Sequence, residues 1–252
     1  MDKETLFIHL VFKTQYGSRL YGTNDSKSDT DWKYLFLPTL KDVLLGKQIM
    51  KTKFVSPNVE DKSLQVDEDF IPVQKFAYDF LKGVPYAIEI AYGADGSHAE
   101  QKYINVLFQS FVQELKEQFL NKKLSGFLGF VNNISNKVIK GHMSNGLEFK
   151  DLYHGIRIAH QAIELLTKET LTLPYDEKTV NFLLSVKNEE MLMKDVCDSF
   201  LKKSHEMELA LEETKLQELT PQLEVTFENW LYKWMVNFYD LRGMYLRANV
   251  YV

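Results

Sequence analysis

The chain has 252 residues, of which 45% are hydrophobic, enough to bury the core of two small domains or of one large one. Its net charge of -5 argues against a protein whose main role is to coat nucleic acid, because that affinity comes largely from neutralised phosphates. A single cysteine, Cys197, excludes an internal disulfide framework and a cysteine-rich zinc site; without a membrane-span or signal-peptide pattern, we expect a cytoplasmic protein with no membrane partner.

Two hydrophobic patterns follow one another along the chain. Up to about residue 70, short apolar runs such as "LFIHLVF", "WKYLFLP" and "KFVSP" are broken by Gly, Pro, Asn and Asp, which is typical of strands. From about residue 73 onward, apolar residues recur at helical spacing, which predicts about seven amphipathic helices. Breaks between helices are expected at 83–85, 92–98, 140–146, 174 and 219–221. The order predicts an α+β fold, with a small mixed sheet and its helices in residues 1–100 and an all-helical domain in residues 101–252.

The first expected strand, "LFIHLVFKTQ" at 6–15, is followed by Gly17 and Ser18 and then by a short helical turn. Unpaired backbone N–H groups at such a turn favour an anion, and glycine lets a phosphate approach the main chain closely. We therefore interpret Gly17 and Ser18 as a phosphate cradle. Arg19 and Lys33 are near enough in sequence to help neutralise the phosphates, with solvated surface charges as an equal alternative for both.

Two aspartates follow the polar loop "TNDSKS" and open the next expected strand. The strand period of two puts Asp29 and Asp31 on one face. Neighbouring carboxylates repel each other unless a cation joins them, and such hard oxygens suit a Mg²⁺ ion that also binds substrate phosphates. The stretch therefore predicts a pair of metal-binding carboxylates that face the phosphate cradle. The alternative is a plain polar connection between two strands.

Charge is uneven along the chain. Residues 121–160 carry six bases against Glu148 and Asp151, a local charge of +4. The six are Lys122, Lys123, Lys137, Lys140, Lys150 and Arg157. Solvated helix faces are the ordinary explanation, and a surface that meets phosphates is the functional one. His154 and Arg157 share one predicted helical face. Either both side chains reach the nucleotide, or His154 is a core histidine and Arg157 a surface arginine.

The window "YGSRLYGTNDSKSDTDWKYLFLP" (16–38) resembles the signature of the DNA polymerase beta-like nucleotidyltransferase superfamily, a Gly-Ser followed about ten residues later by Asp-x-Asp. Its second "YG" and its "SDTD" are most similar to the YcgL/RlaP group of predicted nucleotidyltransferases of bacteria and phages. The acidic strand and helix at 66–93 and the Lys-x-x-x-His-x-x-Arg helix at 150–174 also resemble that group. One departure is "GVP" at 83–85, where the group has Gly-Asn-Pro.

The resemblance implies a polymerase-beta-like palm with a third carboxylate on a neighbouring strand, completing a triad that holds two divalent ions, Mg²⁺ or Mn²⁺. Asp67 matches the group's spacing, eight residues before Lys75, and Asp69 is the alternative because it shares the same strand face. The implied substrate is a nucleoside triphosphate (NTP).

The implied reaction moves a nucleoside monophosphate to an acceptor hydroxyl, with release of pyrophosphate. An RNA or tRNA 3′ end is the expected acceptor, given the group's association with RNA repair and the positive segment at 121–160. AMP transfer to a protein or small molecule is the alternative within enzymes. A non-catalytic nucleotide-binding module is the alternative from another class, and the intact pair of Asp29 and Asp31 counts against it.

Overall fold

The computed structural model describes residues 9–26, 28–45, 51–56, 64–93, 106–140 and 146–248. The described strands form one four-stranded sheet in the order β1-β2-β4-β3. They are β1 (Leu10–Tyr16), β2 (Thr30–Phe36), β3 (Thr52–Val55) and β4 (Val66–Pro72). β2 runs antiparallel to β1 and parallel to β4, and β3 runs antiparallel to β4. The mixed sheet predicted for the N-terminal part is thus confirmed.

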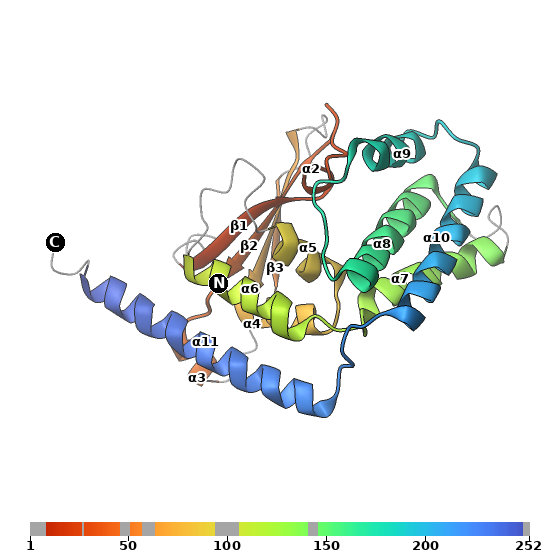
Figure 1. The fold of residues 1–252 in the computed structure, drawn as a ribbon. Helices are drawn as coiled ribbons and strands as arrows, with labels where there is room; N and C mark the ends of the chain where they lie inside the picture. Colours follow the sequence, from red (N-terminus) through yellow and green to blue (C-terminus); the bar gives the residue numbers. More distant parts are fainter. Residues whose placement is uncertain are drawn as a thin grey trace.

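Two short helices lie among the strands and eight longer ones follow them in the described part of the chain. The short ones are α2 (Ser18–Tyr21) and α3 (Leu40–Leu44). The others are α4 (Val73–Leu81), α5 (Pro85–Gly93), α6 (Val106–Phe119), α7 (Ser125–Ile139), α8 (Phe149–Lys168), α9 (Glu177–Lys187), α10 (Met193–Glu213) and α11 (Pro221–Ala248). Helix α8 packs against both α7 and α10, and Figure 1 shows α11 running along the lower side of the molecule past α6 and α4. The change from strands to helices falls at Val73, as predicted.

The two faces of the sheet bury different groups because side chains alternate along each strand. Leu35 of β2 and Ile71 of β4 belong to the main core beneath the helices. Tyr34 and Phe70 point the other way, where their rings stack 4.4 Å apart between centroids. The candidate site residues of β2 and β4 have odd numbers, so they lie on the face that meets the helices.

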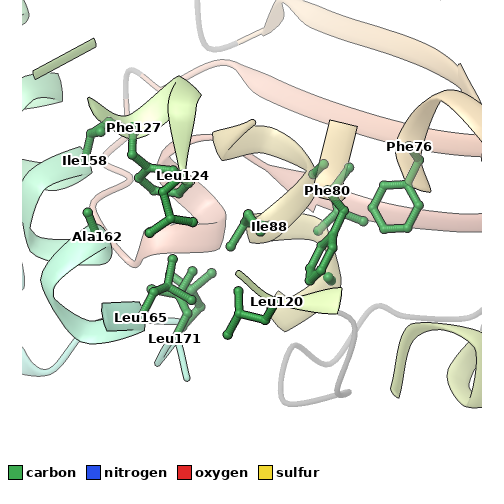
Figure 2. Packing of buried hydrophobic residues seen from close by; sticks show 14 of the residues in the cluster. Phe76, Phe80, Ile88, Leu120, Leu124, Phe127, Ile158, Ala162, Leu165 and Leu171 are labelled. Atoms are coloured by element: carbon green, nitrogen blue, oxygen red, sulfur yellow. The ribbon is translucent and has the colours of Figure 1, made fainter. Parts of the chain in front are cut away.

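One large cluster of buried apolar side chains runs through the sheet region and the helical region. Figure 2 shows Phe80 of α4 and Ile88 of α5 near Leu124, with Phe127 of α7 and Leu165 of α8 beyond them. Burying a large apolar side chain contributes about 1.5–3 kcal/mol, so these contacts hold the helices against the sheet region. A shared core therefore fixes the sheet region and the helical region, which together line the cavity described below, relative to each other.

In the described part of the chain, eight helices follow the strands where about seven were expected, and the breaks before α7 and after α9 carry no glycine or proline. Leu124 (φ 30°) and Glu189 (φ 60°) are non-glycine residues with positive φ, at the breaks before α7 and after α9. Such positions are uncommon for residues with a side chain, so sequence pattern alone does not predict them. The predicted domain boundary near residue 100 lies outside the described residues. Among the described helices, none combines the length and the apolar character that crossing a membrane requires.

Candidate active site

Gly17 joins β1 to α2 beside Asp31, whose register partner on β1 is Tyr16. Its φ is +66°, a left-handed conformation that glycine adopts without steric cost. A Cβ atom added to Gly17 would lie only 2.3 Å from Oδ2 of Asp31. The carbonyl of Gly17 accepts hydrogen bonds from the backbone N–H groups of Leu20 (3.0 Å) and Tyr21 (3.3 Å), which starts the short helical turn. The sequence therefore needs glycine here both for the backbone and for the close approach of a carboxylate.

Asp31 of β2 and Asp67 of β4 are paired in register across the parallel strands. Partial burial raises the pKa of Asp31, and the neighbouring charges of Asp29 and Asp67 raise it further, while Lys33 opposes them. The carboxylate of Asp31 is therefore repelled by the two neighbouring carboxylates of Asp29 and Asp67. Within the described ranges, no three His, Cys, Asp or Glu side chains are grouped so as to hold a metal ion by themselves. The crowding of negative charge nonetheless fits a cation whose remaining ligands come from a substrate.

Asp67 and Asp69 differ in what surrounds them. Asp67 accepts hydrogen bonds from Nε2 of Gln65 (3.0 Å) and pairs with Nζ of Lys53 (2.7 Å). Burial alone would raise its pKa, but the hydrogen bonds from Gln65 and Lys53 lower it below the usual value.

Asp69 is buried, and its carboxylate forms ion pairs with two lysines. It pairs with Lys33, its register partner on β2, and with Nζ of Lys51 at 2.8 Å. Its burial would raise the pKa, but hydrogen bonds from both lysines outweigh that effect and lower it. Of the two candidates for the third carboxylate, Asp67 is the one that lies opposite Asp31, and Asp69 lies two register pairs further along the strands, opposite Lys33.

A cavity of about 580 Å³ opens between the sheet edge and helices α8 and α9. Seven of the predicted site residues line it: Gly17, Ser18, Asp29, Asp31, Lys33, His154 and Arg157. The further lining residues are Tyr16, Tyr21, Asp25, Ser28, Lys150, Tyr153 and Lys187. Arg19 and Asp67, which were also predicted, are not part of the lining. Residues more than a hundred positions apart in the sequence thus meet around one space.

His154 and Arg157 both reach the cavity from α8, yet their environments differ. Burial, followed by the nearby charges of Arg157 and Lys150, lowers the pKa of His154 to about 4. His154 is therefore neutral near pH 7. Arg157 is only 7% exposed, which corrects the alternative that it is a surface arginine. Its guanidinium pairs with Glu89 and lies 4.1 Å over the ring of Tyr21.

Three further residues at the site were not predicted. Glu89 is completely buried and accepts from Arg157, from the hydroxyl of Tyr16 and from that of Tyr21 (3.1 Å). One signal could have revealed it, because it is the single charged residue in the apolar helix "PYAIEIAYG". Tyr153 and Lys187 bind the loop that precedes Asp29 across long sequence separations, and no local signal marks either residue.

Comparisons with known proteins place the chain in a family. The family model described as "RNA repair pathway DNA polymerase beta family", RlaP, matches residues 3–232. An uncharacterized 38.9 kDa protein of Enterobacteria phage T4, from the nrdC-mobD intergenic region, is 25% identical over 134 residues. That alignment covers 52% of this chain and 39% of the phage protein, so the chain spans well under half the length of this relative.

A solved structure adds a distant likeness. The crystal structure of a nucleotidyltransferase-like protein from Exiguobacterium sibiricum aligns with 83% of this chain and 71% of its own, at 10% identity and a TM-score of 0.33. The sheet edge with its paired aspartates, the glycine beside them and the family match over most of the chain lead to one assignment. The chain belongs to the RNA repair pathway DNA polymerase beta family (RlaP).

Proposed function

We propose that this chain transfers a nucleoside monophosphate from an NTP to an acceptor hydroxyl. The observation that carries the proposal is the meeting of Gly17, Ser18, Asp29 and Asp31 around one cavity, with Asp67 in register beside Asp31. A cradle without a carboxylate pair would suit simple phosphate binding, and a carboxylate pair without a cradle would suit a structural cation. Their combination suits catalysis on a nucleoside triphosphate.

The outer phosphates of the NTP would lie against Gly17 and Ser18. Gly17 lines the cavity, and the carboxylate of Asp31 lies where a Cβ on Gly17 would be. The cationic side chain of Lys33 lines the same cavity from β2, and that of Lys150 lines it from α8. Both can neutralise phosphate charge. Arg19 was predicted for the same role but does not line the cavity, and it takes no part in this proposal.

Asp29, Asp31 and Asp67 would hold the divalent ions, Mg²⁺ or Mn²⁺. Bound there, such an ion supplies charge neutralisation at the phosphates and lowers the pKa of an acceptor hydroxyl. The acceptor oxygen forms a new bond to the α-phosphorus, the bond to the leaving pyrophosphate breaks, and the hydroxyl proton passes to water. His154, neutral near pH 7, and the buried Arg157 line the same cavity from α8.

An RNA 3′ end, including that of tRNA, is the acceptor that we favour. The family description refers to an RNA repair pathway, and basic residues lie beside the cavity on one side. Lys150 lines the cavity, and Lys137 is joined to α8 by an ion pair with Asp151 at 2.9 Å. Lys140 is exposed at the end of α7, one turn beyond Lys137.

The other lysines of the positive segment lie elsewhere. Lys122 and Lys123 precede α7, whose 15 residues separate them from Lys140 by about 20 Å at 1.5 Å per residue. Lys122 also pairs with Glu218 at 2.5 Å. We therefore propose that the RNA-binding surface consists of Lys137, Lys140 and Lys150, and that Arg157, which is buried, is not part of it.

The proposal is tested by incubating the protein with each NTP labelled in its α-phosphate, with Mg²⁺ or Mn²⁺, and with separate pools of RNA and protein. The labelled species identifies both donor and acceptor. Label on RNA 3′ ends supports the function as stated. Label on protein or on a small molecule moves the acceptor to the alternative, and tight nucleotide binding without any label transfer would favour the non-catalytic module.

A further inference from the structure

The loop between α2 and β2 is held by two side chains from the helical part of the chain. Thr23 is completely buried, and its Oγ1 lies 2.8 Å from the hydroxyl of Tyr153 on α8. Lys187, the last residue of α9, donates from Nζ to the carbonyl oxygen of Thr23 (3.3 Å) and to Oδ2 of Asp25 (3.0 Å). It also lies 3.5 Å from Oγ of Ser28. Figure 1 shows α9 beside α2, on the side of the sheet where this loop lies.

The same loop is closed on itself by Asp25 and Ser28. The backbone N–H of Asp25 donates to Oγ of Ser28 (2.9 Å), and that hydroxyl donates to Oδ1 of Asp25 (3.0 Å). The backbone N–H of Ser28 donates to the carbonyl of Asp25 at 3.2 Å. Lys187 therefore binds a compact turn, and the residue that follows this turn is Asp29.

The geometry favours a role for Lys187 in holding the loop over a role in binding phosphate. An ammonium group has three N–H donors, and three oxygens of the loop lie within reach of Lys187. Its side chain is 31% exposed and that of Asp25 is 40% exposed, so the pair lies at the rim of the cavity. An exposed ion pair alone contributes little stability, so its value lies in where it holds the backbone.

We propose that Lys187 is a positioning residue: through Asp25 and Ser28 it fixes the backbone that places Asp29 beside Asp31. This inference rests on the proposed function, because it assumes that Asp29 takes part in transfer. Catalytic carboxylates must be held to a fraction of an ångström, and a displacement of about 1 Å can cost a hundredfold in rate. The hydrogen bonds of the turn are local, and the contact from α9 is what fixes the turn relative to the helical part of the chain.

Two variants and a matched control test the inference. Lys187→Met removes the ammonium group, and Asp25→Ala removes its carboxylate partner. Lys178→Met is the control, because Lys178 lies exposed in the first turn of the same helix and outside the cavity lining. Hydrogen exchange of the backbone amides in residues 17–32 is measured without substrate, and kcat and the KM for the NTP are measured in the transfer assay.

We expect Lys187→Met to speed exchange in residues 17–32 and to lower kcat about tenfold to a hundredfold with KM changed less than about twofold. Asp25→Ala should act in the same direction, and the losses in the double variant should be less than additive, because both side chains hold the same turn. Lys178→Met should match the wild type in both measurements.

Other outcomes would overturn the inference. A raised KM with unchanged kcat in Lys187→Met, together with a silent Asp25→Ala, would make Lys187 a direct phosphate ligand. Unchanged hydrogen exchange in Lys187→Met would show that the contact does not hold the loop. Exchange is measured without substrate, so this last result decides the question even if the wild type transfers no label, which would instead count against the proposed function.

Discussion

Glu89 of α5 and Arg157 of α8 form an ion pair that is buried beneath the candidate active site. The side chain of Glu89 has no exposed surface and that of Arg157 is 8% exposed. The pair joins the sheet region to the helical region, and the hydroxyls of Tyr16 and Tyr21 bind the same carboxylate. Removing one partner of such a pair leaves the other charge buried without a counter-charge.

We expect Arg157→Met to lower the free energy of unfolding by about 3–5 kcal/mol, because it leaves the carboxylate of Glu89 buried without its cation. Adding Glu89→Gln should recover a large part of that loss, since a neutral amide needs no counter-charge. Lys203→Met, which breaks an exposed pair with Glu206, is the control and should cost less than about 1 kcal/mol. Urea unfolding measures all of these variants. Additive losses from Arg157→Met and Glu89→Gln would contradict the account.

Gly17→Ala should abolish transfer and should lower the free energy of unfolding by less than Arg157→Met does. The new Cβ would meet Oδ2 of Asp31 at 2.3 Å, and the φ of +66° disfavours alanine. Gly129→Ala is the matched control, because a Cβ at Gly129 in α7 meets nothing within 4 Å. Replacing this helical glycine should raise stability by about 0.5–1 kcal/mol and leave transfer unchanged. Normal transfer by Gly17→Ala would show that Asp31 need not approach this backbone.

Asp67→Asn and Asp69→Asn should fail in different ways. Asp67 lies opposite Asp31, so its loss should lower transfer about a thousandfold with little effect on folding. Asp69 is buried and pairs with Lys33 and Lys51, so Asp69→Asn should destabilise the fold by roughly 1–3 kcal/mol and leave transfer largely intact where the protein is folded. Transfer rates and urea midpoints are measured for both. Lost transfer in Asp69→Asn with near-normal transfer in Asp67→Asn would make Asp69 the third carboxylate of the triad.

RNA binding should depend on the lysines beside the cavity. Changing Lys137, Lys140 and Lys150 together to Gln should weaken RNA binding and flatten its salt dependence by about one unit of log-log slope for each lost phosphate contact. Changing Lys122 and Lys123 to Gln is the control, because both lie at the far end of α7. Binding is measured from about 50 to 200 mM salt. Parallel lines for the triple variant and the wild type would rule this surface out.

The sequence predicted the local features of the site and missed those that join distant segments. Gly17, Asp29 and Asp31 were predictable because they lie within one window, where a strand, a turn and a second strand fix their spacing. The choice between Asp67 and Asp69 was not, because it depends on the register of β4 against β2, and the chain between these strands is long. A register shift of two residues would place Asp69, in place of Asp67, opposite Asp31.

The missed residues act across large sequence separations. Glu89 binds Arg157, which was itself predicted, across 68 positions, and Lys187 binds Asp25 across 162. Hydrophobic periodicity indicates which face of a helix is buried but not which polar group it meets there. Glu89 was open to suspicion as a lone acid in an apolar helix, whereas Lys187 resembles any lysine near a helix end.

The most direct test of the central claim is α-phosphate label transfer by the wild type, by Asp31→Asn and by the exposed control Asp198→Asn, with Mg²⁺ or Mn²⁺ and an RNA pool. We predict that the wild type and Asp198→Asn label RNA at equal rates. Asp31→Asn should be slower by about a thousandfold or more, because several kcal/mol of transition-state stabilisation are lost. Its stability should be unchanged or slightly higher, since repulsion from Asp29 and Asp67 is relieved. Wild-type-like transfer by folded Asp31→Asn would contradict the account.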